Sequence, residues 1–215
     1  MEQFSGTLGR IVDPGVVAVM RGADPDAVVE IGRALVDGGV TALEVTADSA
    51  DAAESIGALR ASLGDEAVVG AGTVYDAETV RETVDAGAEF VVSPTVELAV
   101  VEACQEAGVP VAPGAFTPTE VRTAREAGAD LVKVFPAASA GPAHLSRIAG
   151  PLPDVPLMPT GGVDLASAPA YVEAGAVAVG VGSALVEDRL VEAGDFEAIT
   201  DRAGAFVEAV EDARE

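Results

Sequence analysis

A short glycine-containing phrase recurs along the chain and constrains its fold more than any other feature. It occurs as VDGGV at 36–40, DAGAEF at 85–90, EAGVP at 106–110, EAGAD at 126–130 and EAGAVAV at 173–179. Each copy follows an amphipathic helical pattern and precedes a short β-branched run. We interpret it as a helix that ends on a left-handed glycine and leads through a turn into a buried strand. The spacing of about twenty residues, or twice that, is typical of repeated β–α units.

Eight Val-rich apolar runs fit parallel strands that are covered on both sides. They lie at 16–20, 42–46, 67–70, 90–92, 109–112, 131–135, 155–158 and 176–180. Helices are predicted at 24–37, 50–63, 76–86, 95–107, 117–127, 141–149, 165–174 and 195–213, with an extra N-terminal helix within 2–12. Start signals support three of them: Asp24-Pro25, Asp76 and the segment Thr117-Pro118-Thr119-Glu120.

This order predicts an α/β fold, a (β/α)8 TIM barrel with a short N-terminal helix, as a single domain over residues 1–215. An open doubly wound sheet is the alternative. It would normally carry a glycine-rich dinucleotide-binding turn after its first strand, and the segment MRGADPDA does not match one.

The charge balance excludes several classes of partner. Twelve basic and 36 acidic residues give a net charge of −24, which repels nucleic acid and anionic lipid. The acids are spread through the helical segments, and Lys133 is the only lysine. Such a surface is similar to that of proteins from salt-accumulating halophiles, although an ordinary acidic protein remains the alternative.

The chain shows no sign of export or of membrane insertion. No apolar run approaches the length of a membrane span, and the first residues lack the pattern of a signal peptide. The single cysteine, Cys104, excludes an internal disulfide and agrees with a cytoplasmic location. It lies in a helical pattern, where a small apolar core residue is the favoured interpretation.

Lys133 is the most specific functional signal. It interrupts the apolar strand 131–135, and strand alternation places it with Leu131 and Phe135, opposite Val132 and Val134. If the valines face the helices, Lys133 points into the barrel. Burial would lower its pKa and make the amine nucleophilic. The alternative is a lysine whose stem packs while its ammonium group reaches water.

Glu44 follows the same logic in the strand 42–46, between the apolar neighbours Leu43 and Val45. A carboxylate in an apolar pocket near a lysine suits the proton transfers of imine chemistry. The alternative is a simple ion pair with Lys133 or Arg21.

Glycine turns follow the last two predicted strands, at Gly161-Gly162 and at Gly182-Ser183. The loops after strands 7 and 8 form the usual phosphate site of this barrel, where backbone N–H groups face the anion. Arg21, which follows the first strand, would supply a cation for a substrate carboxylate or phosphate.

Metal chemistry is not indicated. One cysteine and one histidine, His144, cannot build a zinc site, which argues against a metal-dependent aldol mechanism. His144 is expected on a helix surface without a catalytic role. No nucleotide-binding fingerprint is present, so we expect no cofactor.

At these residues the chain resembles the 2-dehydro-3-deoxy-phosphogluconate / 4-hydroxy-2-oxoglutarate aldolase family. The matching phrases, GGVTALEVT, VGAGTV, FVVSP, VKVFPA, PTGGV and VGVGSALV, appear in family order over nearly the whole chain. The resemblance implies a class I aldolase with a phosphorylated keto-acid substrate, no metal or cofactor, a homotrimer and a role in the Entner–Doudoroff pathway.

The resemblance also implies roles for individual residues. Lys133 would form the Schiff base, and Glu44 would transfer protons. Thr73 would bind the pyruvate carboxylate, and Arg21, Pro94 and Phe135 would complete that end of the site. Phosphate would lie on the backbone around four residues: Gly161, Gly162, Gly182 and Ser183.

One departure bears on the substrate. Many members carry Leu-Arg-Thr after the LEVT strand, and that arginine binds the substrate carboxylate, whereas this chain has Ala47-Asp48-Ser49. Arg21 is a candidate replacement. The segment RGADPDA, the residues at 48–49 and SAGP at 139–142 are similar to 2-dehydro-3-deoxy-6-phosphogalactonate aldolases, so the C4 epimer stays open.

Two further hypotheses keep the barrel but change the activity. In one, the protein is a sugar-phosphate isomerase or epimerase, with Glu44 as the base and Lys133 as an electrostatic stabiliser. In the other, it is a binding barrel without catalysis, which gives no reason for a lone buried lysine.

Overall fold

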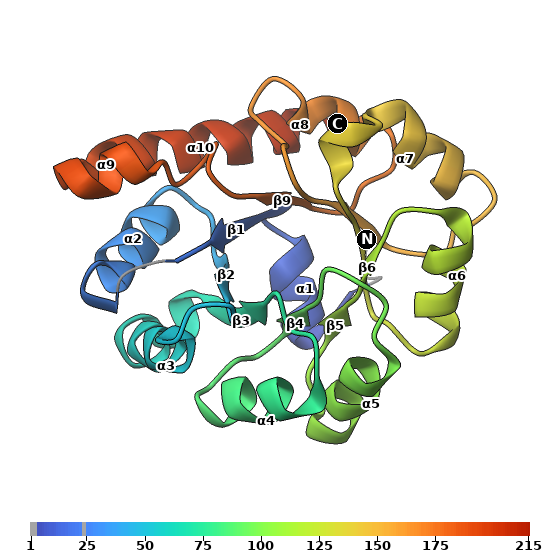
Figure 1. Ribbon diagram of the computed structural model, residues 1–215. Coiled ribbons are helices and arrows are strands. Elements are labelled where there is room, and N and C mark those ends of the chain that lie inside the picture. The colour runs from blue at the N-terminus through green and yellow to red at the C-terminus, as the bar shows by residue number, and fades with distance from the viewer. Residues whose placement is uncertain (1–3, 23–24) are drawn as a thin grey trace.

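Short parallel strands curl into a ring that helices cover on the outside (Figure 1). The computed structural model describes residues 4–22 and 25–215. The strands are β1 (Val16–Met20), β2 (Ala42–Thr46), β3 (Val68–Gly72), β4 (Val91–Val92), β5 (Val111–Ala112), β6 (Gly114–Ala115), β7 (Val132–Val134), β8 (Leu157–Pro159) and β9 (Val179–Val181). All eight predicted strands are therefore present, with ends that shift by a few residues.

The strands pair in two sheets. One has the order β5-β4-β3-β2-β1-β9 and the other β6-β7-β8. Isolated bridges between Leu157 and Ala176 and between Thr160 and Gly180 connect the second sheet to the β9 segment. Pro113, which has no N–H to donate, lies between β5 and β6. The predicted α/β class and barrel-like arrangement are confirmed. The prediction of one closed eight-stranded barrel is wrong, because the described strands form two ladders.

The helices lie outside the ring, except for α1. They are α1 (Gly6–Val12), α2 (Pro25–Asp37), α3 (Ala52–Leu63), α4 (Ala77–Asp85), α5 (Leu98–Ala107), α6 (Pro118–Glu126), α7 (Pro142–Ala149), α8 (Ala168–Glu173), α9 (Asp188–Ala193) and α10 (Phe196–Asp212), with 3₁₀ turns at Gly64–Glu66 and Ala137–Ser139. The sequence did not predict the short α9. Asp76 caps α4 and Thr117 forms a capping box on α6, as predicted. Asp24 lies outside the described residues.

The recurring glycine phrase ends helices as expected. One glycine of each copy has a positive φ: Gly39 (90°), Gly87 (109°), Gly108 (71°), Gly128 (100°) and Gly175 (103°). An L side chain rarely adopts this conformation, so the glycine lets the chain leave the helix and turn into the next strand.

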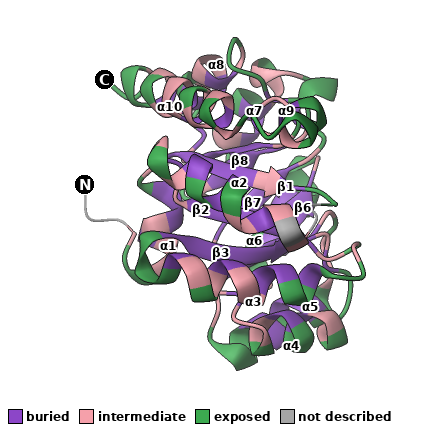
Figure 2. Ribbon diagram, turned by 90° about the vertical axis from the view of Figure 1, so that its left-hand side faces the viewer, coloured by how far each residue is buried: buried purple, intermediate pink, exposed green. Residues whose placement is uncertain are grey.

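Two apolar layers hold the fold together, one on each face of the strands. Outward-facing residues such as Val132 and Val134 pack against the helices. Inward-facing residues such as Val17, Leu131 and Met158 form a separate cluster inside the ring. Figure 2 shows the buried strands between helices whose outer surfaces are exposed. Cys104 is fully buried in the outer layer, and burial raises the pKa of its thiol to about 12, which confirms the core interpretation.

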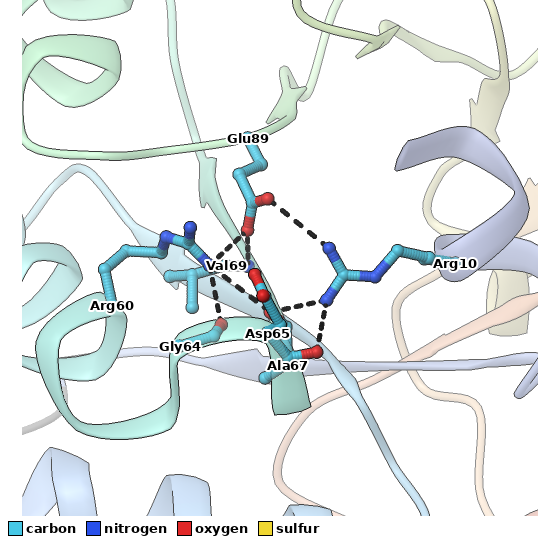
Figure 3. Close-up of polar contacts among 7 residues, drawn as sticks. All are labelled: Arg10, Arg60, Gly64, Asp65, Ala67, Val69 and Glu89. Atoms are coloured by element: carbon cyan, nitrogen blue, oxygen red, sulfur yellow. Dashed lines mark hydrogen bonds and ion pairs between the residues drawn. The ribbon is translucent and has the colours of Figure 1, made fainter. Parts of the chain in front are cut away.

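Helix α1 closes the amino-terminal end of the ring. Its Ile11 is buried in the inner cluster, with Leu8 packed against that cluster. Arg10 of α1 and Arg60 of α3 approach the carboxylate of Glu89 from opposite sides, at 3.5 Å and 2.7 Å (Figure 3). Arg10 also donates to the carbonyl of Ala67, at 3.0 Å. Because α1 covers the amino-terminal end of the ring, access to its interior is expected at the carboxyl ends of the strands.

Candidate active site

A cavity of about 470 Å³ opens at the carboxyl ends of the strands. Its lining combines charged side chains with glycine turns: Val19, Arg21, Glu44, Lys133, Phe135, Thr160, Gly161, Gly162, Val163, Asp164, Gly182, Ser183 and Ala184. Eight of the ten residues predicted for the site are in this lining. Thr73 and Pro94 are not.

Lys133 lies on β7, with Gly114 of β6 and Met158 of β8 as its register partners. The predicted alternation is confirmed, because Leu131 belongs to the inner cluster whereas Val132 and Val134 pack toward the helices. Lys133 is 5% exposed, and its Nζ lies 4.8 Å from the centroid of the Phe135 ring. The amine is therefore buried at the cavity wall, next to an aromatic face that can stabilise a cation.

Glu44 lies on β2 and is 1% exposed. Its Oε2 has no hydrogen-bond partner among the described residues. Burial raises the pKa of Glu44 above its ordinary value, and the positive charges of Lys133 and Arg21 oppose that rise. A carboxyl group with a raised pKa and an unused oxygen in a cavity is suited to accept and return a proton.

Gly72 makes room for this carboxylate. A Cβ atom at Gly72 would collide with the Oε1 atom of Glu44. Gly72 ends β3, beside the end of β2 at Thr46. The absent side chain at this position therefore lets Glu44 lie across the neighbouring strand.

Two glycine turns line the cavity, as predicted. Gly161 and Gly162 have φ values of 92° and 77°, which favour glycine. Gly182 and Ser183 follow β9, the hydrogen-bonded neighbour of β1. Asp164 also faces the cavity, but its Oδ1 accepts hydrogen bonds from the amide and hydroxyl groups of Ser167, at 2.9 Å and 2.7 Å.

Arg21 pairs with Asp48 at the mouth of the cavity. Its Nη1 donates to Oδ2 of Asp48 at 2.6 Å. Arg21 therefore lines the cavity as expected, and its partner Asp48 lies at the position where the resemblance led us to expect an arginine.

The two remaining predicted residues lie beside the cavity. Thr73 directly follows β3 and has a φ of 58°, an unusual conformation for a β-branched residue. Pro94 follows β4, and its backbone oxygen would collide with a Cβ atom at Gly114, the register partner of Lys133. Both are close in the fold to residues of the lining.

Thr46 was not among the predicted site residues. Its side chain is fully buried, and its Oγ1 has no hydrogen-bond partner among the described residues. It lies two residues after Glu44 on β2, so alternation puts both side chains on the same face. Burial combined with an unused hydroxyl group is a signal that a strand pattern alone does not carry.

His144 and possible metal-binding residues are the other candidate sources of catalysis. His144 stacks on Phe116 with 4.7 Å between ring centroids, and its Nε2 lies 2.7 Å from the Phe116 carbonyl oxygen. Within residues 4–22 and 25–215, no cluster of three or more His, Cys, Asp or Glu residues could hold a metal ion. No helix of the described chain is long and apolar enough to cross a membrane.

Comparisons of the sequence with known proteins agree on one family. The sequence model of KDPG and KHG aldolases matches residues 10–202. A 2-dehydro-3-deoxy-phosphogluconate aldolase from Treponema pallidum (strain Nichols) is 40% identical over 173 residues, which are 80% of this chain and 82% of that protein. A 2-dehydro-3-deoxy-6-phosphogalactonate aldolase from Escherichia coli (strain K12) is 34% identical over 200 residues, 92% of this chain and 95% of that protein.

A solved structure extends the likeness to three dimensions. The KDPG aldolase of Legionella pneumophila, with pyruvate captured as a covalent carbinolamine intermediate, matches with a TM-score of 0.87 and 28% identity, over 94% of this chain and 98% of that one. Fold, site and comparisons define a carbon–carbon lyase, an aldolase of the class I, Schiff-base-forming type. The chain belongs to the KDPG and KHG aldolase family.

Proposed function

We propose that the enzyme cleaves 2-dehydro-3-deoxy-6-phosphogluconate to pyruvate and glyceraldehyde 3-phosphate, the aldol step of the Entner–Doudoroff pathway. The observation that carries this proposal is the burial of Lys133 and Glu44 in one cavity that also contains two glycine turns. The relatives support a substrate of this class, because they are named for the gluconate and galactonate forms.

In this mechanism Lys133 is the nucleophile. Its neutral amine adds to the C2 keto carbon to give a carbinolamine, which loses water and leaves an imine. The imine accepts the electron pair of the C3–C4 bond as that bond breaks. The aldehyde leaves, the resulting enamine takes a proton at C3, and hydrolysis releases pyruvate and regenerates the amine.

Glu44 moves the protons of this sequence. It assists loss of water from the carbinolamine, takes the proton of the C4 hydroxyl group during cleavage and returns a proton to C3. The raised pKa supports both directions of transfer, because it brings the carboxyl group closer to the pH at which the enzyme works.

We assign binding residues to the two anionic ends of the substrate from their positions in the fold. The phosphate would bind to backbone N–H groups around the two turns that contain Gly161, Gly162, Gly182 and Ser183. Thr73, Pro94 and Phe135 would surround the pyruvate unit, and Arg21 would hold a substrate anion at the mouth. A homotrimer stays a prediction from the resemblance, and a cytoplasmic location stays a prediction from the single cysteine.

The galactonate epimer is the second candidate. The motivating observation is Asp48 at the position of the family arginine, together with the relative named for the galactonate substrate. Membership of the aldolase family sets aside the epimerase and the non-catalytic barrel as alternatives.

A turnover assay decides between the epimers. It would compare kcat/KM for the gluconate-type and galactonate-type keto-deoxy acids, each with and without the 6-phosphate, by release of pyruvate. We expect the highest value for the phosphorylated gluconate type. A higher value for the galactonate type would establish the second candidate, and no release from any of the four compounds would refute the proposed substrate class.

A further inference from the structure

The turn after β2 presents a carboxylate to the residue that follows β1. The two strands are parallel neighbours, with Met20 level with Val45. Arg21 comes directly after Met20, and Asp48 comes two residues after the end of β2. The amide of Ala47 donates to the carbonyl of Gly72 at 2.7 Å, which fixes the beginning of this turn against β3. Asp48 is thus held by the backbone at the height of the cavity mouth.

The pair is too exposed to be explained as a stabilising contact. The side chains of Arg21 and Asp48 are 63% and 43% exposed, and ion pairs at such sites add little to stability. Its location indicates another role, because Arg21 lines two adjacent cavities. One is the catalytic cavity, and the other, of about 660 Å³, extends between α2 and α9. The long side chain of Arg21 could point into either cavity. Its 2.6 Å contact with Asp48 favours one of these orientations.

We propose that Asp48 is a positioning residue, which holds the guanidinium group of Arg21 at the cavity mouth as a binding group for a substrate anion. The inference rests on the proposed function. A guanidinium group has five N–H donors, so a contact through Nη1 does not exhaust its capacity for a carboxylate or phosphate. A restrained arginine also loses less conformational entropy when the anion binds.

Asp48 repels an anion, so any favourable effect of Asp48 on anion binding must pass through Arg21. This gives the proposal a specific thermodynamic consequence. Removal of the carboxylate should weaken anion binding only while Arg21 is present. The opposite hypothesis, that Asp48 competes with the substrate for Arg21, makes the reverse prediction, because removal of a competitor would tighten binding.

The test is a double-mutant cycle with Asp48→Asn, Arg21→Ala and the double variant. We expect Asp48→Asn to raise KM by about two- to tenfold, the scale for preorganisation of one long side chain, and to lower kcat by less. The double variant should have the KM of Arg21→Ala alone. The control Asp51→Asn makes the same charge change three residues away, at a side chain with no capping hydrogen bond, and should leave KM unchanged.

Two binding measurements identify the anion and do not depend on turnover. Affinity for inorganic phosphate, measured by calorimetry, reports on a phosphate site. The pyruvate concentration that half-saturates borohydride trapping reports on a carboxylate site. A loss of affinity for either probe in Asp48→Asn, absent in the Arg21→Ala background, supports the proposal. Unchanged affinity for both probes, tighter binding, or equal effects in both backgrounds would overturn it, even if no sugar acid is cleaved.

Discussion

The carboxylate of Glu44 lies in the space that a side chain at Gly72 would fill. The two residues belong to adjacent strands, and Gly72 lies one residue before Thr73, which has a positive φ. Access of the carboxylate to the cavity therefore depends on an absent side chain in the next strand. This relationship gives a test of Glu44 that leaves Glu44 itself in place.

Gly72→Ala should displace the carboxylate and lower kcat by about 100-fold, the usual scale for loss of a general acid–base group. The fold should persist, because the atoms that must move are the end of a flexible side chain. Gly70→Ala is the matched control on the same strand. Its Cβ atom would meet the ring of Phe90 at 2.5 Å, so we expect lower stability with a smaller loss of kcat. Full kcat in Gly72→Ala would show that the position of this carboxylate does not matter.

Glu44→Gln should change how stability depends on pH. A carboxyl group with a raised pKa in the native state binds more protons in the folded protein than in the unfolded one. The stability that it contributes is therefore present below the unfolded-state pKa, near 4.5, and is lost as pH rises through the raised native pKa. Relative to Glu44→Gln, the wild type should lose stability as pH rises from about 4.5. Urea midpoints of both proteins across pH would measure this, and parallel curves would contradict burial of the acid.

A substitution of Glu89, which lies far from the active site, should change the stability of the fold. It joins α1 and α3 at the closed end of the ring through Arg10 and Arg60, and its side chain is 23% exposed (Figure 3). Glu89→Gln should lower the free energy of unfolding by about 1 kcal/mol and leave KM unchanged. The control is Glu126→Gln, which removes an exposed i,i+4 pair with Arg122 and should have no measurable effect. Equal stabilities of the two variants in urea would refute this role of Glu89.

The excess of acid should make stability depend on salt. With a net charge of −24, repulsion between surface carboxylates opposes the folded state, and at 1 M salt the Debye length of about 3 Å screens it. We expect the melting temperature to rise between low and molar KCl. An unchanged melting temperature would contradict the halophile interpretation.

Much of the fold followed from local signals. The glycine phrases marked the helix ends because a positive φ is a property of a single residue, and Thr117 with Glu120 formed the predicted capping box. The division of the strands into two ladders could not be derived in this way. It depends on the break in pairing at Pro113 and on the isolated bridges of Leu157 and Thr160, which are contacts between segments distant in sequence.

The site residues also differ in whether local sequence signals could identify them. Lys133 and Glu44 were recognisable because burial of a charged residue inside an apolar strand costs free energy, and such a residue is therefore a candidate for a functional role. Asp48 suggested the loss of an arginine and a likeness to the galactonate aldolases, but the sequence could not show that its carboxylate contacts Arg21. Thr46 could be placed at the carboxyl end of its strand but had no predicted role, and burial without a hydrogen-bond partner distinguishes it.

The most direct test of the central claim is to trap pyruvate on Lys133 with borohydride. Hydride reduces the imine irreversibly, and the N-terminal amine is the only competitor because the chain has no other lysine. Intact-mass analysis and peptide mapping should find one reduced pyruvate adduct on Lys133, with loss of activity. Lys133→Arg should abolish lysine labelling without a change in net charge. An enzyme that cleaves its substrate but forms no adduct at Lys133 would contradict the assignment of this lysine as the Schiff-base residue.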